Sequence, residues 1–173
     1  MIAKLKRRPV TVIWLVLLVL FIADKPAAEA APHAGMVGLT ASWQSGQTDI
    51  GFPVWASKKL VVTPSLSVVH VSNFATDVGF VLAVRVNHGG DKAVPYYGVR
   101  AGALHRSPHE GKALTDYLVG GMFGGECFLQ DHFSVGVEAQ VNVVFSDEHS
   151  YLFGNPNGTN INTAAAVMAT FYF

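Results

Sequence analysis

"HFSVGVEAQVNVVF", residues 132–145, alternates apolar and polar residues with a period of two. One set of alternate positions is entirely apolar: Phe133, Val135, Val137, Ala139, Val141, Val143 and Phe145. The other face carries Ser134, Gly136, Glu138, Gln140 and Asn142. Successive side chains of a β-strand point to opposite faces of a sheet. The stretch therefore predicts a long strand with one apolar and one polar face.

The same alternation recurs along the chain and predicts an all-β protein of about eight strands. We expect strands over residues 36–44, 50–56, 60–70, 77–87, 95–104, 117–129, 132–145 and 161–173. Each is close to the length that crosses a bilayer when tilted. No segment after residue 35 has a convincing helical stripe or an apolar run long enough for a membrane helix.

The composition of the polar faces indicates which solvent each face meets. A soluble β-sandwich usually carries many Lys, Glu and Asp residues on its water-facing side. Here the polar positions are mostly small and uncharged, and only 14% of all residues are charged. In a narrow barrel the inward face must fit a small lumen, and the outward face meets lipid. We therefore predict an eight-stranded antiparallel up-and-down transmembrane β-barrel.

A soluble periplasmic sandwich or lipocalin-like carrier is the alternative. It predicts that the apolar face of residues 133–145 is buried against other protein. Extraction from cells distinguishes the transmembrane barrel from the soluble carrier, because a membrane barrel stays with the envelope until detergent is added.

Four charged residues fall on the inward faces of four consecutive predicted strands: Arg85, Arg100, Glu126 and Glu138. A buried charge that lacks a partner costs several kcal/mol. We expect these two cations and two anions to form a network in the lumen. The alternative for Arg85 and Glu126, which lie near predicted turns, is that they face water at strand ends.

The first 30 residues have the pattern of an export signal. Basic residues precede an apolar run over 10–23, and Ala28-Glu29-Ala30 matches an A-x-A cleavage site. We predict a cleaved signal peptide over 1–30 and a barrel domain over 31–173, the alternative being a retained membrane anchor. The single cysteine, Cys127, excludes an internal disulfide.

With its export signal and alternating segments, the chain resembles the small outer-membrane β-barrels of Gram-negative bacteria, the OmpA-like and OmpX-like group. The most telling piece is "GGECFLQDHFSVGVEAQVNVVF", residues 124–145. The resemblance implies residence in the cell outer membrane, among its lipids and lipopolysaccharide. It also implies a structural, adhesive or surface-interaction role through external loops, chiefly 105–116 and 146–160, whose ligand is unknown.

A general porin is not expected, because an eight-stranded barrel has an interior only just wide enough for side chains. A nucleic-acid partner is not expected either, because the formal net charge is zero.

The chain closes on "ATFYF", in which Phe171 and Phe173 share the outward face and Tyr172 lies on the other. We expect this strand to close the barrel against the first strand near residues 37–43. In the family that the chain resembles, a terminal Phe is a recognition signal for the outer-membrane assembly machinery. Phe171 and Phe173 are therefore the expected assembly signal.

Hydrolytic chemistry is the second functional alternative. "HVSN", residues 70–73, resembles the His-x-Ser-Asn motif of outer-membrane lipid A deacylases. The resemblance implies His70 as the base and Ser72 as the nucleophile, with Asp77 the nearest acid to orient His70. That family carries its motif near the last hairpin, with a downstream Glu that has no counterpart here, so a non-enzymatic role is expected.

No cofactor or metal is expected. His105 and His109 lie in a predicted loop without further ligands, and such histidines are usually solvated.

Overall fold

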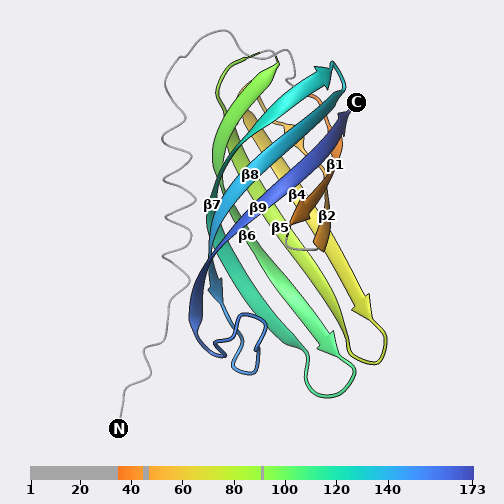
Figure 1. Ribbon diagram of the computed structural model, residues 1–173, viewed down its shortest axis with the longest axis vertical. Coiled ribbons are helices and arrows are strands. Elements are labelled where there is room, and N and C mark those ends of the chain that lie inside the picture. The colour runs from red at the N-terminus through yellow and green to blue at the C-terminus, as the bar shows by residue number, and fades with distance from the viewer. Residues whose placement is uncertain (1–34, 45–46, 91) are drawn as a thin grey trace.

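The computed structural model describes residues 35–44, 47–90 and 92–173, which form a closed antiparallel β-barrel (Figure 1). The predicted signal peptide, 1–30, lies outside the described residues. Within the described ranges, no helix is long and apolar enough to span a membrane.

In the described part of the chain, the barrel wall has eight positions, filled by nine strands. They are β1 (Gly38–Gln44), β2 (Gln47–Gly51), β3 (Val54–Trp55), β4 (Leu60–Val71), β5 (Ala75–Asn87), β6 (Ala93–Pro108), β7 (Leu114–Gln130), β8 (Phe133–Phe145) and β9 (Thr159–Tyr172). Both β2 and β3 pair with β4, so they are consecutive parts of one wall position. The break falls at Phe52 and Pro53, where proline cannot donate to a ladder. The predicted eight-stranded barrel is confirmed.

The last strand closes the barrel against the first, as predicted. The β1–β9 pairing runs from Gly38 opposite Tyr172 to Gln44 opposite Ala166. The amide of Phe173 extends it by donating to the Val37 carbonyl over 2.8 Å. Closure removes the free edges that an open sheet would expose in a membrane.

The two faces of β8 have the predicted orientation. Val137 is 62% exposed on the outside, whereas Ser134 is 0% exposed and Gln140 is also buried on the inside. The soluble alternative required the apolar face to be buried against protein, and the structure leaves it exposed.

The connections define two ends of the barrel. At the hairpin end, β4–β5, β6–β7 and β8–β9 are joined over residues 72–74, 109–113 and 146–158. The terminal end holds the C-terminus and the links from β3 to β4, from β5 to β6 and from β7 to β8. The predicted loop 105–116 is mostly strand, because the β6–β7 ladder continues to Arg106 opposite Leu114. Residues 105–108, "HRSP", show no apolar alternation, so their strand character is invisible in the sequence.

Apolar side chains fill the lumen at the terminal end. We call this group the terminal plug: Trp55, Val61, Val94, Phe128 and Tyr172, with Met36 packed against it. The Tyr172 ring stacks on Phe128 at 5.6 Å between ring centroids and meets Trp55 edge-on at 6.4 Å. The polar lumen begins directly beside this plug.

Candidate functional site in the barrel lumen

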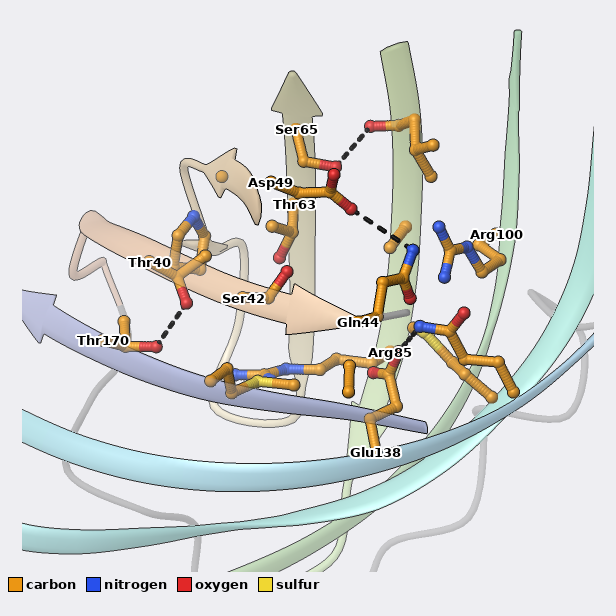
Figure 2. Close-up of a pocket in the computed structure, with 18 residues that line it drawn as sticks. Thr40, Ser42, Gln44, Asp49, Thr63, Ser65, Arg85, Arg100, Glu138 and Thr170 are labelled. Carbon is orange, nitrogen blue, oxygen red and sulfur yellow. Dashed lines mark hydrogen bonds between the residues drawn. The ribbon is translucent and has the colours of Figure 1, made fainter. Parts of the chain in front are cut away.

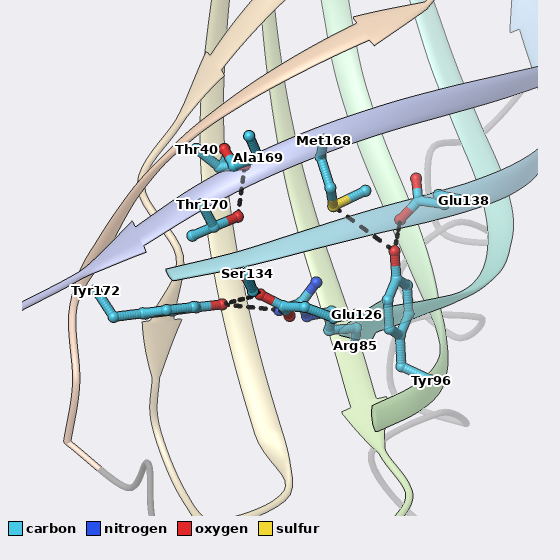
Figure 3. A network of polar contacts seen from close by, with 10 residues as sticks. All are labelled: Thr40, Arg85, Tyr96, Glu126, Ser134, Glu138, Met168, Ala169, Thr170 and Tyr172. Atoms are coloured by element: carbon cyan, nitrogen blue, oxygen red, sulfur yellow. Dashed lines mark hydrogen bonds and ion pairs between the residues drawn. The ribbon is translucent and has the colours of Figure 1, made fainter. Parts of the chain in front are cut away.

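Glu126 of β7 lies at the centre of the first polar cluster, beside the terminal plug (Figure 3). Its carboxylate is 1% exposed and forms an ion pair with Arg85 of β5. It also accepts hydrogen bonds from the Tyr172 hydroxyl over 2.7 Å and from the Ser134 hydroxyl. These partners come from β5, β8 and β9, so one carboxylate links four strands.

Glu138 of β8 is the centre of a second cluster. It accepts hydrogen bonds from the Tyr96 hydroxyl over 3.0 Å and from the Gln140 amide over 2.7 Å. The Arg85 guanidinium lies over the Tyr96 ring, 4.6 Å from its centroid, in a cation–π arrangement. Tyr96 therefore connects the two clusters.

Arg100 of β6 differs from the other predicted lumen charges. It is 8% exposed, and it forms no hydrogen bond and no ion pair within 4 Å with any residue in the described ranges. The carboxylates of Glu138 and Asp49 act on its charge through space without contacting it. The structure thus brings Arg85 and Glu126 into contact and holds Arg100 apart.

The lumen contains a central cavity of about 70 Å³. Figure 2 shows Arg85, Arg100 and Glu138 around it, together with Gln44 and Asp49. A space of this size holds only a few water molecules. The side chains of the terminal plug and of the two carboxylate clusters therefore fill most of this part of the lumen.

Toward the hairpin end, a second cavity of about 240 Å³ shares the wall residues Gln44, Asp49 and Arg100 with the first. We call it the hairpin-end cavity. Its wall combines polar side chains with apolar ones such as Leu104, Leu118, Val144 and Phe153.

The alternation of the sequence assigned Ser134 and Tyr172 to inward faces but did not identify them as partners of Glu126, and nothing in it indicated that Tyr96 contacts Glu138. Their pairing depends on how far each strand is shifted against the next. For example, Glu126 and Ser134 lie eight residues apart across the β7–β8 hairpin, and a register irregularity falls between Phe128 and Gln130. No local sequence signal reports such a shift.

The structure does not assemble His70, Ser72 and Asp77 into a hydrolytic site. The His70 ring bonds the Thr76 hydroxyl over 2.8 Å, and Ser72 lies in the following turn. Asp77 accepts two hydrogen bonds from Arg106, over 2.7 and 2.5 Å. Because strand side chains alternate, Asp77 points to the opposite face of β5 from Thr76, and so away from His70.

The described residues contain no group of three or more His, Cys, Asp or Glu side chains arranged to hold a metal ion. His105, predicted to lie in a loop, is in β6, where its ring bonds the Thr115 hydroxyl of β7 over 3.0 Å.

No protein-family model matches the sequence, and its comparison with characterised proteins gives no match. Among the solved structures that share the fold are two bacterial proteins. One is the N-terminal β-barrel domain of Pseudomonas aeruginosa OprF, with a TM-score of 0.56, 12% identity, and 81% of this chain and 98% of that chain covered. The other is Neisserial surface protein A, NspA, with a TM-score of 0.54, 12% identity, and 80% of this chain and 94% of that chain covered. The small outer-membrane barrel fold expected from the sequence is confirmed.

Proposed function

We propose that the protein is a non-enzymatic β-barrel of the outer membrane that acts through its hairpin end, in a structural, adhesive or surface-interaction role. The observation that carries the proposal is the outward face of the wall. Large apolar side chains are exposed there on every long strand, among them Leu66, Phe80, Tyr97, Phe123, Val137 and Val167. Monomeric soluble proteins rarely expose continuous apolar surface of this kind, and a bilayer would cover it.

Exposed aromatic side chains at two heights along the barrel axis support the position of the barrel in a membrane. Phe171 and Phe173 lie at the terminal end, and Trp43 lies near the tip of the β1–β2 hairpin. Outer-membrane barrels carry aromatic girdles at both interfaces of their apolar band. We assign the terminal end to the periplasmic side and the hairpin end to the cell exterior.

The closed lumen argues against general permeation. The buried rings of Trp55 and Tyr172 fill the terminal end, and the Arg85–Glu126 ion pair lies directly beside them. Vesicles that contain the protein are therefore expected to exclude small sugars as effectively as vesicles without it. Rapid sugar entry at the rate given by a porin would contradict this.

The hairpin end offers a preformed surface for a ligand. The loop 146–158 is held by Asp116, which accepts hydrogen bonds from the Asp147 amide and the Ser150 hydroxyl, each over 2.7 Å. Tyr151 and Phe74 are exposed on the connections of this end. An ordered loop with exposed aromatic rings loses little conformational entropy when it binds a partner.

Fractionation of cells tests the proposal. The protein is expected in the outer membrane, and an unheated sample is expected to migrate differently from a heated one in gel electrophoresis. Recovery in the soluble periplasm, or identical migration of both samples, would overturn the proposal. Fatty-acid release from lipopolysaccharide by the wild type but not by Ser72→Ala would instead favour the hydrolase.

Deletion of Phe173 tests the proposed partnership with the assembly machinery. In cells the deletion is expected to reduce the heat-modifiable form several-fold, whereas Phe173→Tyr keeps a terminal aromatic ring and should assemble normally. Refolding of both purified variants into micelles, where the assembly machinery is absent, separates a loss of recognition from a loss of stability. Both variants are expected to refold there, because Phe173 is exposed and forms a single backbone hydrogen bond to Val37. Normal assembly of the deletion in cells would count against this role.

A further inference from the structure

Arg100 is a buried cation that no counter-charge contacts. It is 8% exposed, and no described residue forms a hydrogen bond or an ion pair with its guanidinium. A guanidinium carries several N–H donors in a planar fork, and leaving them unpaired in a buried place is costly. Because Arg100 lines the hairpin-end cavity, a molecule inside that cavity can supply the missing acceptor.

The hairpin-end cavity has room for such a molecule. Its volume is about 240 Å³, whereas a water molecule in the liquid takes up about 30 Å³. The cavity is not fully enclosed, and Phe153 of the loop 146–158 forms part of its wall. It therefore extends from the polar lumen to the loops of the hairpin end.

A carboxylate with spare acceptor capacity lines the same cavity. Asp49 of β2 is 8% exposed, and it accepts hydrogen bonds from the side-chain amides of Gln44 over 3.4 Å and of Gln47 over 3.0 Å. Figure 2 shows the first of these bonds. Carboxylate oxygens have lone pairs for further donors. Gln44 Oε1 beside it is also buried and accepts no bond from the described residues.

The other carboxylate in the cavity wall, Asp116, is already occupied. Its two oxygens accept hydrogen bonds from the Asp147 amide and the Ser150 hydroxyl, each over 2.7 Å. Arg100 and Asp49 are therefore the charges that a ligand would meet.

These two charges select the chemistry of the ligand. An anion alone would pair with Arg100 but be repelled by Asp49, and a cation alone would pair with Asp49 but be repelled by Arg100. A small molecule that carries one group of each charge avoids both conflicts.

Part of the cavity wall is apolar. Leu118 of β7 lies opposite Val144 of β8 in the ladder, and Leu104 contributes from the neighbouring strand β6. Phe153 adds an aromatic ring from the loop. Pockets that combine a few placed polar groups with such a wall favour ligands that also carry an apolar group.

We propose that the hairpin-end cavity binds a free α-amino acid with an apolar side chain. The carboxylate of the ligand pairs with the Arg100 guanidinium, its ammonium group lies toward Asp49 and Gln44 Oε1, and its side chain contacts Leu104 and Leu118. The site deepens the proposed function by naming a ligand class for the hairpin end, and the supply of amino acids from the medium rests on the exterior position assigned to that end.

Equilibrium dialysis of the folded full-length protein in dodecyl maltoside micelles tests the site, with protein-free micelles as the reference. Leucine is compared with ligands that each lack one of its parts. They are 4-methylpentanoate without the amino group, 3-methylbutylamine without the carboxylate, and glycine without the apolar side chain. Leucine is expected to bind at least about ten-fold more tightly than each of them, because every missing part removes a charge-assisted hydrogen bond or an apolar contact.

Two variants assign the charged groups of the ligand to their partners. Arg100→Gln is expected to lower the affinity for leucine about ten-fold without lowering that for 3-methylbutylamine, which has no carboxylate. Asp49→Asn is expected to lower the affinity for leucine about ten-fold without lowering that for 4-methylpentanoate, which has no ammonium group. A general loss of structure would weaken all of these ligands alike. Asp49→Asn decides the matter if Arg100→Gln does not fold.

Arg106→Gln is the matched control. It removes a guanidinium from the same face of β6, but Arg106 pairs with Asp77 and does not line the cavity. This variant should bind leucine like the wild type.

Leucine binding no tighter than that of 4-methylpentanoate or 3-methylbutylamine, or leucine binding unchanged in Arg100→Gln or in Asp49→Asn, would overturn the site. A heat-modifiable outer-membrane protein that does not bind leucine overturns the site alone. Recovery in the soluble periplasm overturns the proposed function, whatever the dialysis gives.

Discussion

Replacement of Glu126 by alanine is expected to lower the free energy of unfolding by about 3–5 kcal/mol, because it leaves the buried Arg85 guanidinium without its counter-charge. The same change removes the acceptor of the Tyr172 and Ser134 hydroxyls. Each lost partner leaves a buried donor unsatisfied, which adds to the cost. Urea unfolding in lipid vesicles measures the change.

Asp77→Ala provides the control for this variant. It also breaks an Arg–carboxylate pair, but the Asp77–Arg106 pair is partly exposed at the hairpin end. Such pairs contribute about 0–1 kcal/mol. The double variant Arg85→Met/Glu126→Leu removes both buried charges and should recover much of the stability. Equal losses from Glu126→Ala and Asp77→Ala would contradict a buried lumen network.

Replacement of Gly98 by valine is expected to prevent the barrel from forming. An added Cβ at this inward position of β6 would meet the Val84 carbonyl oxygen and lie 2.8 Å from the Arg85 Cα. Backbone atoms of the neighbouring strand cannot move aside without breaking the ladder. The expected cost is about 3 kcal/mol or more, at or beyond the upper end for overpacked sites.

The control for this steric prediction is Gly121→Val on the neighbouring strand. Gly121 faces outward, and a Cβ added there meets nothing within 4 Å. Its effect is expected to stay within about 0.5 kcal/mol. The heat-modifiable fraction after refolding into micelles measures both variants. Efficient folding of Gly98→Val would show that the lumen is looser at this point than the packing indicates.

Alternation along single strands predicted much of the fold. It correctly assigned the outward and inward faces of β8, including the exposed Val137 and the buried Gln140, because side-chain direction in a strand is a local property. It also identified Arg85 and Glu126 as inward residues. A network among the inward charges was expected, but which of them pair could not be predicted, because the pairing depends on the combined register of β5, β6 and β7.

Strand boundaries were predicted less well. The predicted strand 50–56 begins earlier, at Gln47, and is interrupted at Pro53. Likewise, β6 extends to Pro108 because the Asp77–Arg106 pair and the continuing ladder hold polar residues in strand conformation. Such tertiary contacts override weak local propensity.

Lipid contact along β8 is the central claim, and fluorescence quenching tests it most directly. In a Cys127→Ser background, a fluorophore attached to Val137→Cys or to Gln140→Cys is measured in vesicles whose acyl chains carry bromine. The label at position 137 is expected to be strongly quenched and the label at 140 much less, because the two side chains lie on opposite faces of the wall. Equal quenching at both positions, or none at position 137, would contradict a transmembrane barrel with a closed lumen.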